Sequence, residues 1–597
     1  MNCEVKIHHD ENRESLFVKS GENLLEILQN SDFSINAPCG GKGLCGKCKV
    51  KITAGAPTVT SQEREILSRE ELNQGFRLAC LVDIKTDLTV ELPPEQKAEI
   101  VTKGLERKVK LATRVKQFCL SPAEPTIEDQ RDYLTRIQDQ LPVPVEKVNH
   151  SVLEKLEKFK GADYLTAIVK GDKLVQLKLG DPGDGNYGIA VDMGTTTVVL
   201  YLLNLETGDE VDFYSFTNPQ SQFGADLVSR VNYTLEKDGG KEKLQKVLIT
   251  ELNQGLEKLI NRNELTQDQI WEVKIVGNTI MLHSLLGLNA ESIVKAPYIP
   301  VFTDPVTLNP ADLGLKLNSA GEINLLPAIS GYVGADIVGD MLAVDFNLYE
   351  DWNLLIDIGT NGEIVLGKGN EIFACATAAG PALEGANITF GMAGVPGAIS
   401  EYEIKANGEI DYQVIGNQSP KGICGSGLMD IIAQLYKQGF LKKNGAFKKE
   451  LPPRQRMWMT SYEDKPAYKV MNESPAEILL TQQDIREVQL AKGAVATGIK
   501  ILLNKAEIDY ETVNNVYLAG GFGSQINISS ATALGLIPSE LKDKVIKIGN
   551  GAGIGAKLSL LNQKLSRMAE EIADQVDYIE LSSHSDFQKI FMQEMEF

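Results

Sequence analysis

The sequence lacks several features that would place it in a specialised class of protein. No apolar run approaches the roughly 20 residues that span a bilayer. The first residues, Met1 to Glu4, do not have the layout of a signal peptide. Eight cysteines in 597 residues are too few for a disulfide framework. We therefore expect a cytoplasmic protein that does not use a membrane.

Basic residues are also in short supply. Lysine and arginine number 60 against 81 aspartates and glutamates, which gives a formal net charge of −21. A surface of this sign repels phosphate backbones, so we expect no nucleic-acid partner. The charge is better explained by solubility than by docking to a basic partner. With 43% apolar residues, the chain is long enough for three or four packed domains.

Four of the cysteines form one pattern. Cys39, Cys45 and Cys48 have the spacing C-x5-C-x2-C, and Cys80 follows after 31 intervening residues. The loop is rich in glycine, which permits the positive-φ path by which thiolates converge and amides point at sulfur. The spacing differs by one residue from the plant-type C-x4-C-x2-C and resembles adrenodoxin-like and activator-type ferredoxins. It predicts a [2Fe–2S] cluster on these four residues.

A structural zinc site is the alternative, because four cysteines with one C-x2-C pair can bind zinc. Zinc sites usually have two such pairs, whereas three of these cysteines share one loop. The remaining cysteines are expected to be small buried apolar residues: Cys3, Cys119, Cys375 and Cys424.

The sequence around the loop is typical of the β-grasp fold of [2Fe–2S] ferredoxins. We expect strands at 4–8, 15–18, 49–52 and 88–92, and a helix at 22–29. Pro93 and Pro94 end this pattern, so the domain spans 1–94 and a linker spans 95–105. Residues 106–184 form a middle domain with helices at 126–140 and 145–159 and strands at 164–169 and 174–179. It has no catalytic constellation, so a spacer or docking role is expected.

A duplicated motif begins beyond this boundary. Asp192-Met-Gly194-Thr195-Thr196-Thr197 joins two strand-like runs, and Asp357-Ile-Gly359-Thr360-Asn361 does the same 165 residues later. The glycines, threonines and Asn361 can offer amides and hydroxyls to phosphate oxygens, and the two aspartates can hold Mg²⁺ through water. Such a repeat implies two similar lobes, about 187–350 and 351–597, with a cleft between them.

The order of motifs resembles the acetate and sugar kinase/Hsp70/actin superfamily, ASKHA. By this resemblance the two hairpins are phosphate-1 and phosphate-2, and Ala519-Gly520-Gly521-Phe522-Gly523 is the adenosine motif of an ATPase domain at 185–597. Gly425 and Ser426 begin a helical pattern and are a further candidate contact for the nucleotide. The predicted fold is therefore multidomain α/β and α+β.

Four aspartates are candidates for catalysis of ATP hydrolysis. Asp192 and Asp357 end the two motif strands, whereas Asp226 and Asp336 each follow a Gly-Ala pair at a helix start. Aspartate is also a common helix N-cap, and for Asp226 and Asp336 capping is the simpler explanation.

From end to end, the chain resembles the reductive activators of corrinoid proteins. The most diagnostic stretches are 39–48, 218–226, 277–279, 380–387 and 516–523. The resemblance implies ATP-dependent transfer of one electron from the cluster to Co(II), which restores Co(I) in a methyl carrier of an O-demethylase or acetogenic methyltransferase. It also implies Mg²⁺, an upstream donor (ferredoxin, flavodoxin or reductase) and a possible homodimer. The glycine-rich segment 387–400, with Thr389 and Ser400, is a candidate for contacting the corrinoid.

Two other functions fit the same motifs. One is a small-molecule kinase of the ASKHA type with a regulatory cluster. The other is a binding protein in which nucleotide and cluster state gate a partner. The pair of Asp-x-Gly-Thr hairpins does not distinguish them.

Overall fold

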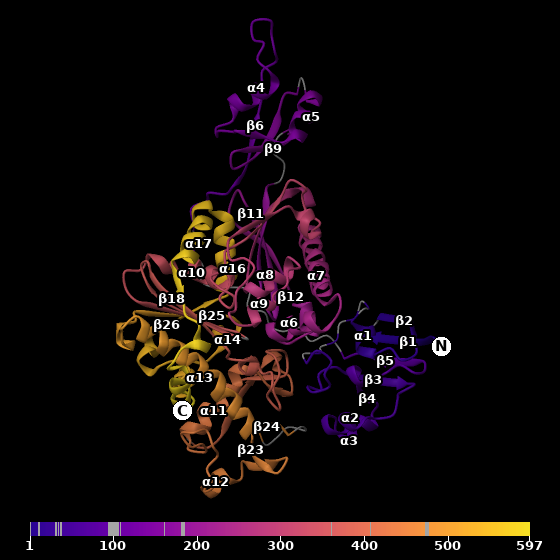
Figure 1. The fold of residues 1–597 in the computed structure, drawn as a ribbon, viewed down its shortest axis with the longest axis vertical. Helices are drawn as coiled ribbons and strands as arrows, with labels where there is room; N and C mark the ends of the chain where they lie inside the picture. The colour runs from indigo at the N-terminus through magenta and orange to yellow at the C-terminus, as the bar shows by residue number, and fades with distance from the viewer. Residues whose placement is uncertain are drawn as a thin grey trace.

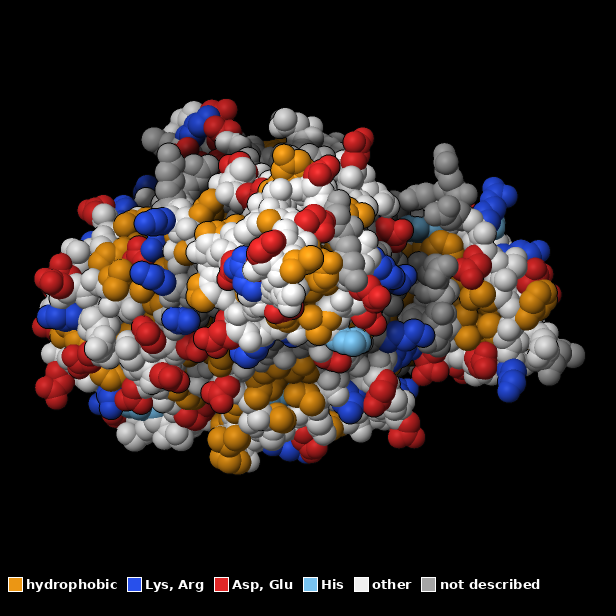
Figure 2. Space-filling view, turned by 90° about the horizontal axis from the view of Figure 1, so that it is seen from above, with side chains coloured by type: hydrophobic (Ala, Val, Ile, Leu, Met, Phe, Trp, Pro, Cys, Tyr) orange, Lys and Arg blue, Asp and Glu red, His pale blue; other side chains and the backbone are white. Residues whose placement is uncertain are grey.

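The computed structural model describes the chain except residues 1, 10, 11, 30, 32, 34, 36, 38, 94–106, 108, 160, 161, 181–184, 360, 406 and 472–476. Figure 1 shows an N-terminal domain at one side, a middle domain at the top and a large two-lobed domain below it. Figure 2 shows acidic and basic side chains interspersed over the upper face. In the described part of the chain, no helix combines the length and the apolar character that a membrane crossing requires.

The N-terminal domain is a five-stranded sheet with the strand order β2-β1-β5-β3-β4. Strands β1 and β2 pair antiparallel, and β5 runs parallel to β1, which is the predicted β-grasp arrangement. Helix α1 is capped by the Asn23 side chain and buries three leucines. The elements are β1 (Asn2–His9), β2 (Asn12–Lys19), α1 (Leu24–Leu28), β3 (Lys49–Ala54), α2 (Ser61–Ile66), α3 (Arg69–Asn73), β4 (Phe76–Leu78) and β5 (Leu88–Glu91).

The middle domain is a four-stranded sheet, β6-β8-β9-β7, with two helices. Its elements are β6 (Val115–Leu120), α4 (Tyr133–Gln140), β7 (Lys147–Val148), α5 (His150–Lys158), β8 (Leu165–Lys170) and β9 (Lys173–Leu179). Cys119 is exposed on the edge strand β6, so the expectation that it is buried was wrong. Side chains alternate between the faces of a strand, and that of Cys119 faces solvent. Cys3, Cys375 and Cys424 are buried as expected.

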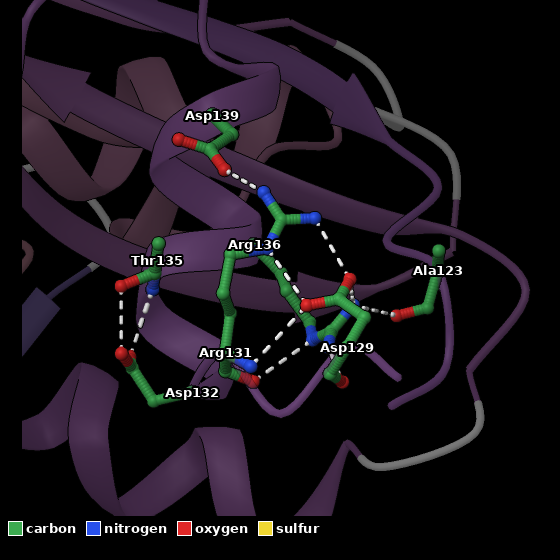
Figure 3. A network of polar contacts seen from close by, with 7 residues as sticks. All are labelled: Ala123, Asp129, Arg131, Asp132, Thr135, Arg136 and Asp139. Carbon is green, nitrogen blue, oxygen red and sulfur yellow. Dashed lines mark hydrogen bonds and ion pairs between the residues drawn. The ribbon is translucent and has the colours of Figure 1, made fainter. Parts of the chain in front are cut away.

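The helix predicted from residue 126 begins only at Tyr133, after Asp132 caps it. Residues 121–132 instead form a loop that Figure 3 shows to be held by its own polar network. The buried Arg136 donates to the Asp129 carboxylate (2.8 Å) and to the Arg131 carbonyl (3.1 Å). These bonds, together with Pro122 and Pro125, favour an ordered loop over another helical turn.

The two lobes have similar sheets. The first has the order β12-β11-β10-β13-β15-β14, and the second has β26-β25-β16-β17-β18-β27. In each, a hairpin (β10–β11 or β16–β17) is antiparallel and its first strand pairs parallel with a later strand, β13 or β25. This arrangement confirms the predicted duplication.

The first lobe contains β10 (Tyr187–Met193), β11 (Thr197–Asn204), β12 (Glu210–Thr217), α6 (Leu227–Glu236), α7 (Gly240–Arg262), β13 (Ile270–Gly277), α8 (Thr279–Leu285), α9 (Glu291–Val294), β14 (Val306–Leu308), β15 (Glu322–Leu325) and α10 (Ala335–Ala343). The second contains β16 (Asn353–Ile358), β17 (Gly362–Lys368), β18 (Glu371–Thr377), β19 (Ala398–Ile404), β20 (Ile410–Val414), β21 (Gly422–Ile423), α11 (Gly425–Lys437), α12 (Pro453–Arg456), β22 (Met459–Tyr462), β23 (Lys465–Lys469), β24 (Leu479–Thr481), α13 (Gln482–Lys505), β25 (Asn515–Ala519), α14 (Gly521–Gln525), α15 (Ile528–Ala533), β26 (Val545–Gly549), β27 (Val576–Tyr578) and α18 (Phe587–Glu594).

Two helices near the end of the chain return to the first lobe. Helix α16 (Gly551–Leu561) packs against β10 and β13, and α17 (Gln563–Gln575) follows it. Helices α10 and α16 cross between the lobes (Figure 1), where Gly339 faces Ala552 and Gly555. A methyl group at Gly555 would overlap the Gly339 carbonyl. The two backbones therefore approach closely because side chains are missing at the crossing.

Arg107 and residues 109–112, which we call the strap, join the middle domain to the lobes. Arg107 donates to the Leu342 carbonyl at the end of α10 and pairs with Asp345. Ala112 exchanges backbone hydrogen bonds with Leu561 (3.0 Å) and Gln563 (3.1 Å) at the end of α16. The strap thus contacts the C-terminal ends of both crossing helices.

The middle domain also contacts the first lobe directly. The Glu322 carboxylate accepts from Arg114 (2.7 Å) and pairs with the buried Lys170 (2.9 Å). Lys170 also donates to the Ala320 carbonyl (2.9 Å).

Candidate cluster site and nucleotide cleft

The four predicted cluster ligands lie together. Cys39 and Cys45 are in the loop before β3, Cys48 immediately precedes β3, and Cys80 lies in a short 3₁₀ turn after β4. Sγ atoms are 3.3 Å apart in the Cys39–Cys45 pair and 3.3 Å apart in the Cys48–Cys80 pair. The hydrogen bond that Cys45 donates lowers the pKa of Cys39 to about 4.

Glycine is required in this loop for two reasons. Gly40, Gly41, Gly43 and Gly46 all have positive φ, between 62° and 83°. A methyl group at Gly43 would lie 2.9 Å from Leu81, and one at Gly46 would lie 2.7 Å from Ile66. Larger residues would therefore strain the backbone and push the loop away from the helix and turn beside it.

Two thiol pairs suit a two-iron cluster, because each tetrahedral iron takes two cysteine ligands. A single zinc ion would need all four sulfurs around one point. Among the described residues, no three His, Cys, Asp or Glu side chains converge in this way. The donor set therefore fits a [2Fe–2S] cluster better than the zinc alternative.

The phosphate-1 hairpin places Asp192 near the end of β10 and Gly194, Thr195 and Thr196 in the turn, with Thr197 beginning β11. Two buried residues hold the carbonyls of this turn. Asn218 binds those of Gly194 (2.9 Å) and Thr196 (2.8 Å), and Arg230 binds that of Thr195 (2.7 Å). With its carbonyls held in this way, the turn can present its amides to an anion.

The phosphate-2 hairpin is built in the same way, with Asp357 near the end of β16. The Gly359 amide donates to the Asn361 carbonyl (2.9 Å) and tightens the turn, while Thr360 lies outside the described residues. Gly520 ends the neighbouring strand with φ 85°, and a methyl group there would overlap the Asp357 carboxylate. The adenosine motif, which continues into α14 with Gly521 and Gly523, therefore adjoins phosphate-2.

Gly425 and Ser426 begin α11, but packing accounts for much of their environment. A methyl group at Gly425 would overlap the Leu383 carbonyl, and the Ser426 hydroxyl donates to the Ser400 carbonyl (2.8 Å). Thr389, in the same glycine-rich region, donates through its amide (2.8 Å) and hydroxyl (2.9 Å) to Asp484. The segment proposed to contact the corrinoid is thus braced by α11 and α13.

Three of the four candidate catalytic aspartates, Asp192, Asp336 and Asp357, lie close enough together to influence one another's pKa. Burial raises the pKa of Asp192 and of Asp336 to about 7 and that of Asp357 to about 6, and the charge of Asp357 adds to the first two. The Asn550 amide donates to Asp192 (2.8 Å). Asp226 instead caps α6, where it accepts from the Ser229 amide and hydroxyl (both 2.8 Å).

Sequence reasoning missed two further acids in this cluster, Asp340 and Glu363. Asp340 is one helical turn after Asp336, and Glu363 is directly opposite Asp357 in the β16–β17 ladder. The four-residue spacing from Asp336 on a helix, and the pairing with Asp357 across a hairpin, could have predicted both from the sequence. Burial and neighbouring carboxylates raise the pKa of each well above its usual value. Neither oxygen of Asp340 meets a donor among the described residues, and the charge of the neighbouring Asp357 adds to the effect of burial on its pKa.

We expect Asp340→Asn to gain stability relative to the wild type as the pH rises from 6 to 8. The pKa of Asp340 in the folded protein is raised, so folded protein binds a proton that unfolded protein has lost above about pH 4. Wild-type stability therefore falls by up to about 1.4 kcal/mol per pH unit below the folded pKa, and asparagine removes this slope. Thermal unfolding in a metal chelator at pH 6, 7 and 8 measures the difference. A stability difference that is constant with pH would contradict the raised pKa of Asp340.

Three models of known protein families match successive parts of the chain. A 2Fe-2S iron–sulfur cluster binding domain model matches residues 7–85, the RACo middle region matches 187–349, and the C-terminal ASKHA domain of RACo matches 351–597. The corrinoid activation enzyme RamQ of Eubacterium limosum is 30% identical over 590 residues, covering 96% of each chain. The chain belongs to the family of reductive activators of corrinoid proteins.

Two further relatives support the assignment to this family. A solved structure titled "Reductive activator for corrinoid,iron-sulfur protein" has a TM-score of 0.74 and 30% identity, covering 100% of this chain and 98% of that one. A [Co(II) methylated amine-specific corrinoid protein] reductase of Methanosarcina barkeri is 24% identical, covering 69% of this chain and 77% of the relative. The matched domains indicate that proteins of this family use a [2Fe–2S] cluster and ATP with Mg²⁺.

Proposed function

We propose that this chain uses ATP hydrolysis to pass one electron to the Co(II) corrinoid of a partner methyl carrier and so restores Co(I). The observation that carries the proposal is the combination in one chain of paired cluster thiols and a duplicated phosphate-binding cleft. The cluster supplies one-electron chemistry when bound. The family relationship supplies the acceptor class, since the relatives are described as acting on corrinoid proteins.

The need for ATP follows from redox arithmetic. Plant-type [2Fe–2S] ferredoxins have reduction potentials of about −400 mV. For a one-electron couple, each ~59 mV of unfavourable potential difference costs about tenfold in the equilibrium constant. An acceptor of much lower potential is therefore hardly reduced without added free energy, which hydrolysis provides.

The cleft residues have separate tasks in this proposal. Asp192 and Asp357 hold Mg²⁺ through water, and the amides of the two hairpin turns hold the phosphates. Gly520, Gly521 and Gly523 leave room for the adenosine. Asn218 and Arg230 position the phosphate-1 turn from behind.

The specific protein partners are part of the same proposal. The corrinoid protein is a methyl carrier of an O-demethylase or acetogenic methyltransferase system, and an upstream ferredoxin, flavodoxin or reductase reloads the cluster. Residues 387–400 contact the corrinoid protein, and the ASKHA domain forms a homodimer.

One assay tests the function directly. Purified holoprotein, Mg·ATP, an artificial reductant and a Co(II) corrinoid protein from the same organism are mixed, and the Co(I) absorption band is followed. Co(I) is expected with ATP and not without it. A phosphorylated metabolite formed in proportion to the ATP consumed would favour the kinase. Failure to form Co(I) with every corrinoid protein of the organism would exclude the proposal.

A further inference from the structure

The N-terminal domain rests on a defined surface of the first lobe, residues 218–243, which we call the dock. Gln29 donates to the Gln222 carbonyl (2.8 Å), and Glu26 pairs with Lys237 (3.1 Å). Lys42 of the cluster loop lies 3.9 Å from Glu236. The charges are therefore complementary in both directions, because each side contributes one acid and one base.

The dock also meets the cluster loop next to a cluster ligand. Gly40 directly follows Cys39, and a methyl group at Gly40 would lie 3.4 Å from the Phe223 carbonyl. Phe223 is held in turn by Tyr233, whose ring centroid is 4.9 Å away, and by Lys243. Docking therefore fixes this end of the cluster loop beside the first lobe.

The same segment supports the phosphate-1 turn. Asn218 and Arg230 hold the carbonyls of all three turn residues, and Arg230 also binds the Gly224 carbonyl (3.0 Å). Arg230 and Asn218 are buried, so they have no solvent to replace these bonds. A movement of the turn on phosphate binding is therefore expected to displace the backbone that carries Gln222 and Phe223.

We infer that residues 218–243 are a nucleotide-responsive dock for the N-terminal domain, and that ATP binding at phosphate-1 weakens docking. The direction rests on the proposed function, because the cluster must leave the first lobe to approach a partner's cobalt. The contacts suit a reversible dock. Both ion pairs are exposed, and a pair of this kind changes an equilibrium by about two- to fivefold.

Linkage makes the inference testable without a corrinoid protein. If ATP weakens docking, then breaking the dock tightens ATP binding by the same factor. Glu26→Lys and Lys237→Glu each place like charges together, whereas the double variant restores an ion pair with its signs exchanged. Lys241→Glu is the matched control, because Lys241 pairs with Glu242 on the same helix, four residues from Lys237.

The experiment measures affinity for a non-hydrolysable ATP analogue by calorimetry, and small-angle X-ray scattering of the holoprotein with and without it. Each single variant should bind the analogue about two- to fivefold more tightly, and the double variant and Lys241→Glu should bind as the wild type does. The analogue should enlarge the wild-type radius of gyration, and it should enlarge that of the single variants less, because their docking is already weakened.

Equal affinity in all variants, or failure of the double variant to restore the wild-type value, overturns the inference. A wild-type scattering profile that is unchanged by the analogue overturns it too. Neither measurement involves a corrinoid protein or hydrolysis, so this inference and the proposed function fail separately.

Discussion

Replacement of Cys48 by alanine is expected to abolish Co(I) formation while ATP binding persists. Cys48 is buried and forms one of the two thiol pairs with Cys80. Without Cys48, one iron lacks a cysteine ligand, so the cluster is not held at the site from which it passes electrons. The nucleotide cleft is built from other elements, so analogue affinity should remain within a few-fold of the wild type.

Iron content, the electron paramagnetic resonance signal of the reduced protein and the Co(I) assay measure this outcome together. Cys3→Ala is the matched control, because Cys3 is buried in the same domain and is not a cluster ligand. It should keep the cluster signal and the rate of Co(I) formation. A Cys48→Ala protein with wild-type signal and Co(I) yield would show that the ligands have been assigned wrongly.

Asp357→Asn should lower the rate of ATP hydrolysis by about 10²–10³. The substitution conserves shape but removes the charge that holds Mg²⁺ at phosphate-2, and metal-ion stabilisation of a transition state is worth several kcal/mol. Co(I) formation should fall in parallel because it depends on hydrolysis. The cluster signal should not change, which distinguishes this variant from Cys48→Ala.

Asp226→Asn distinguishes helix capping from catalysis of ATP hydrolysis as the role of Asp226. Asp226 caps α6 through the amide and hydroxyl of Ser229, and asparagine caps helices about as well as aspartate. ATP hydrolysis should therefore stay within about threefold of the wild type. A loss as large as that of Asp357→Asn would instead place Asp226 in the catalytic set.

The parts predicted correctly from the sequence are those that local sequence determines. The glycine-rich cysteine loop and the two Asp-x-Gly-Thr hairpins each lie within a dozen residues, so spacing alone shows how their groups converge. The helix predicted at 126–140 is present from Tyr133, but its predicted start was wrong, because helical periodicity does not reveal that Arg136 holds the preceding loop by hydrogen bonds to Asp129 and Arg131.

The parts that were missed depend on contacts between distant segments. Asn550 reaches Asp192 across 358 positions of the sequence, and Gln29 reaches the dock across 193. Arg230 supports phosphate-1 through a buried guanidinium that looks like any helical arginine in the sequence. Asp340 and Glu363 could have been found from helical spacing and from strand pairing, but neither residue belongs to a sequence motif.

The strap, Arg107 with residues 109–112, has a consequence for how the middle domain is held. It is bonded to the ends of α10 and α16, the two helices that cross where backbone meets backbone. The middle domain is also held to the first lobe through Glu322, which binds Arg114 and Lys170. Two separate sets of bonds therefore join the middle domain to the helix crossing and to the first lobe, so we expect the middle domain and the first lobe to move as one body.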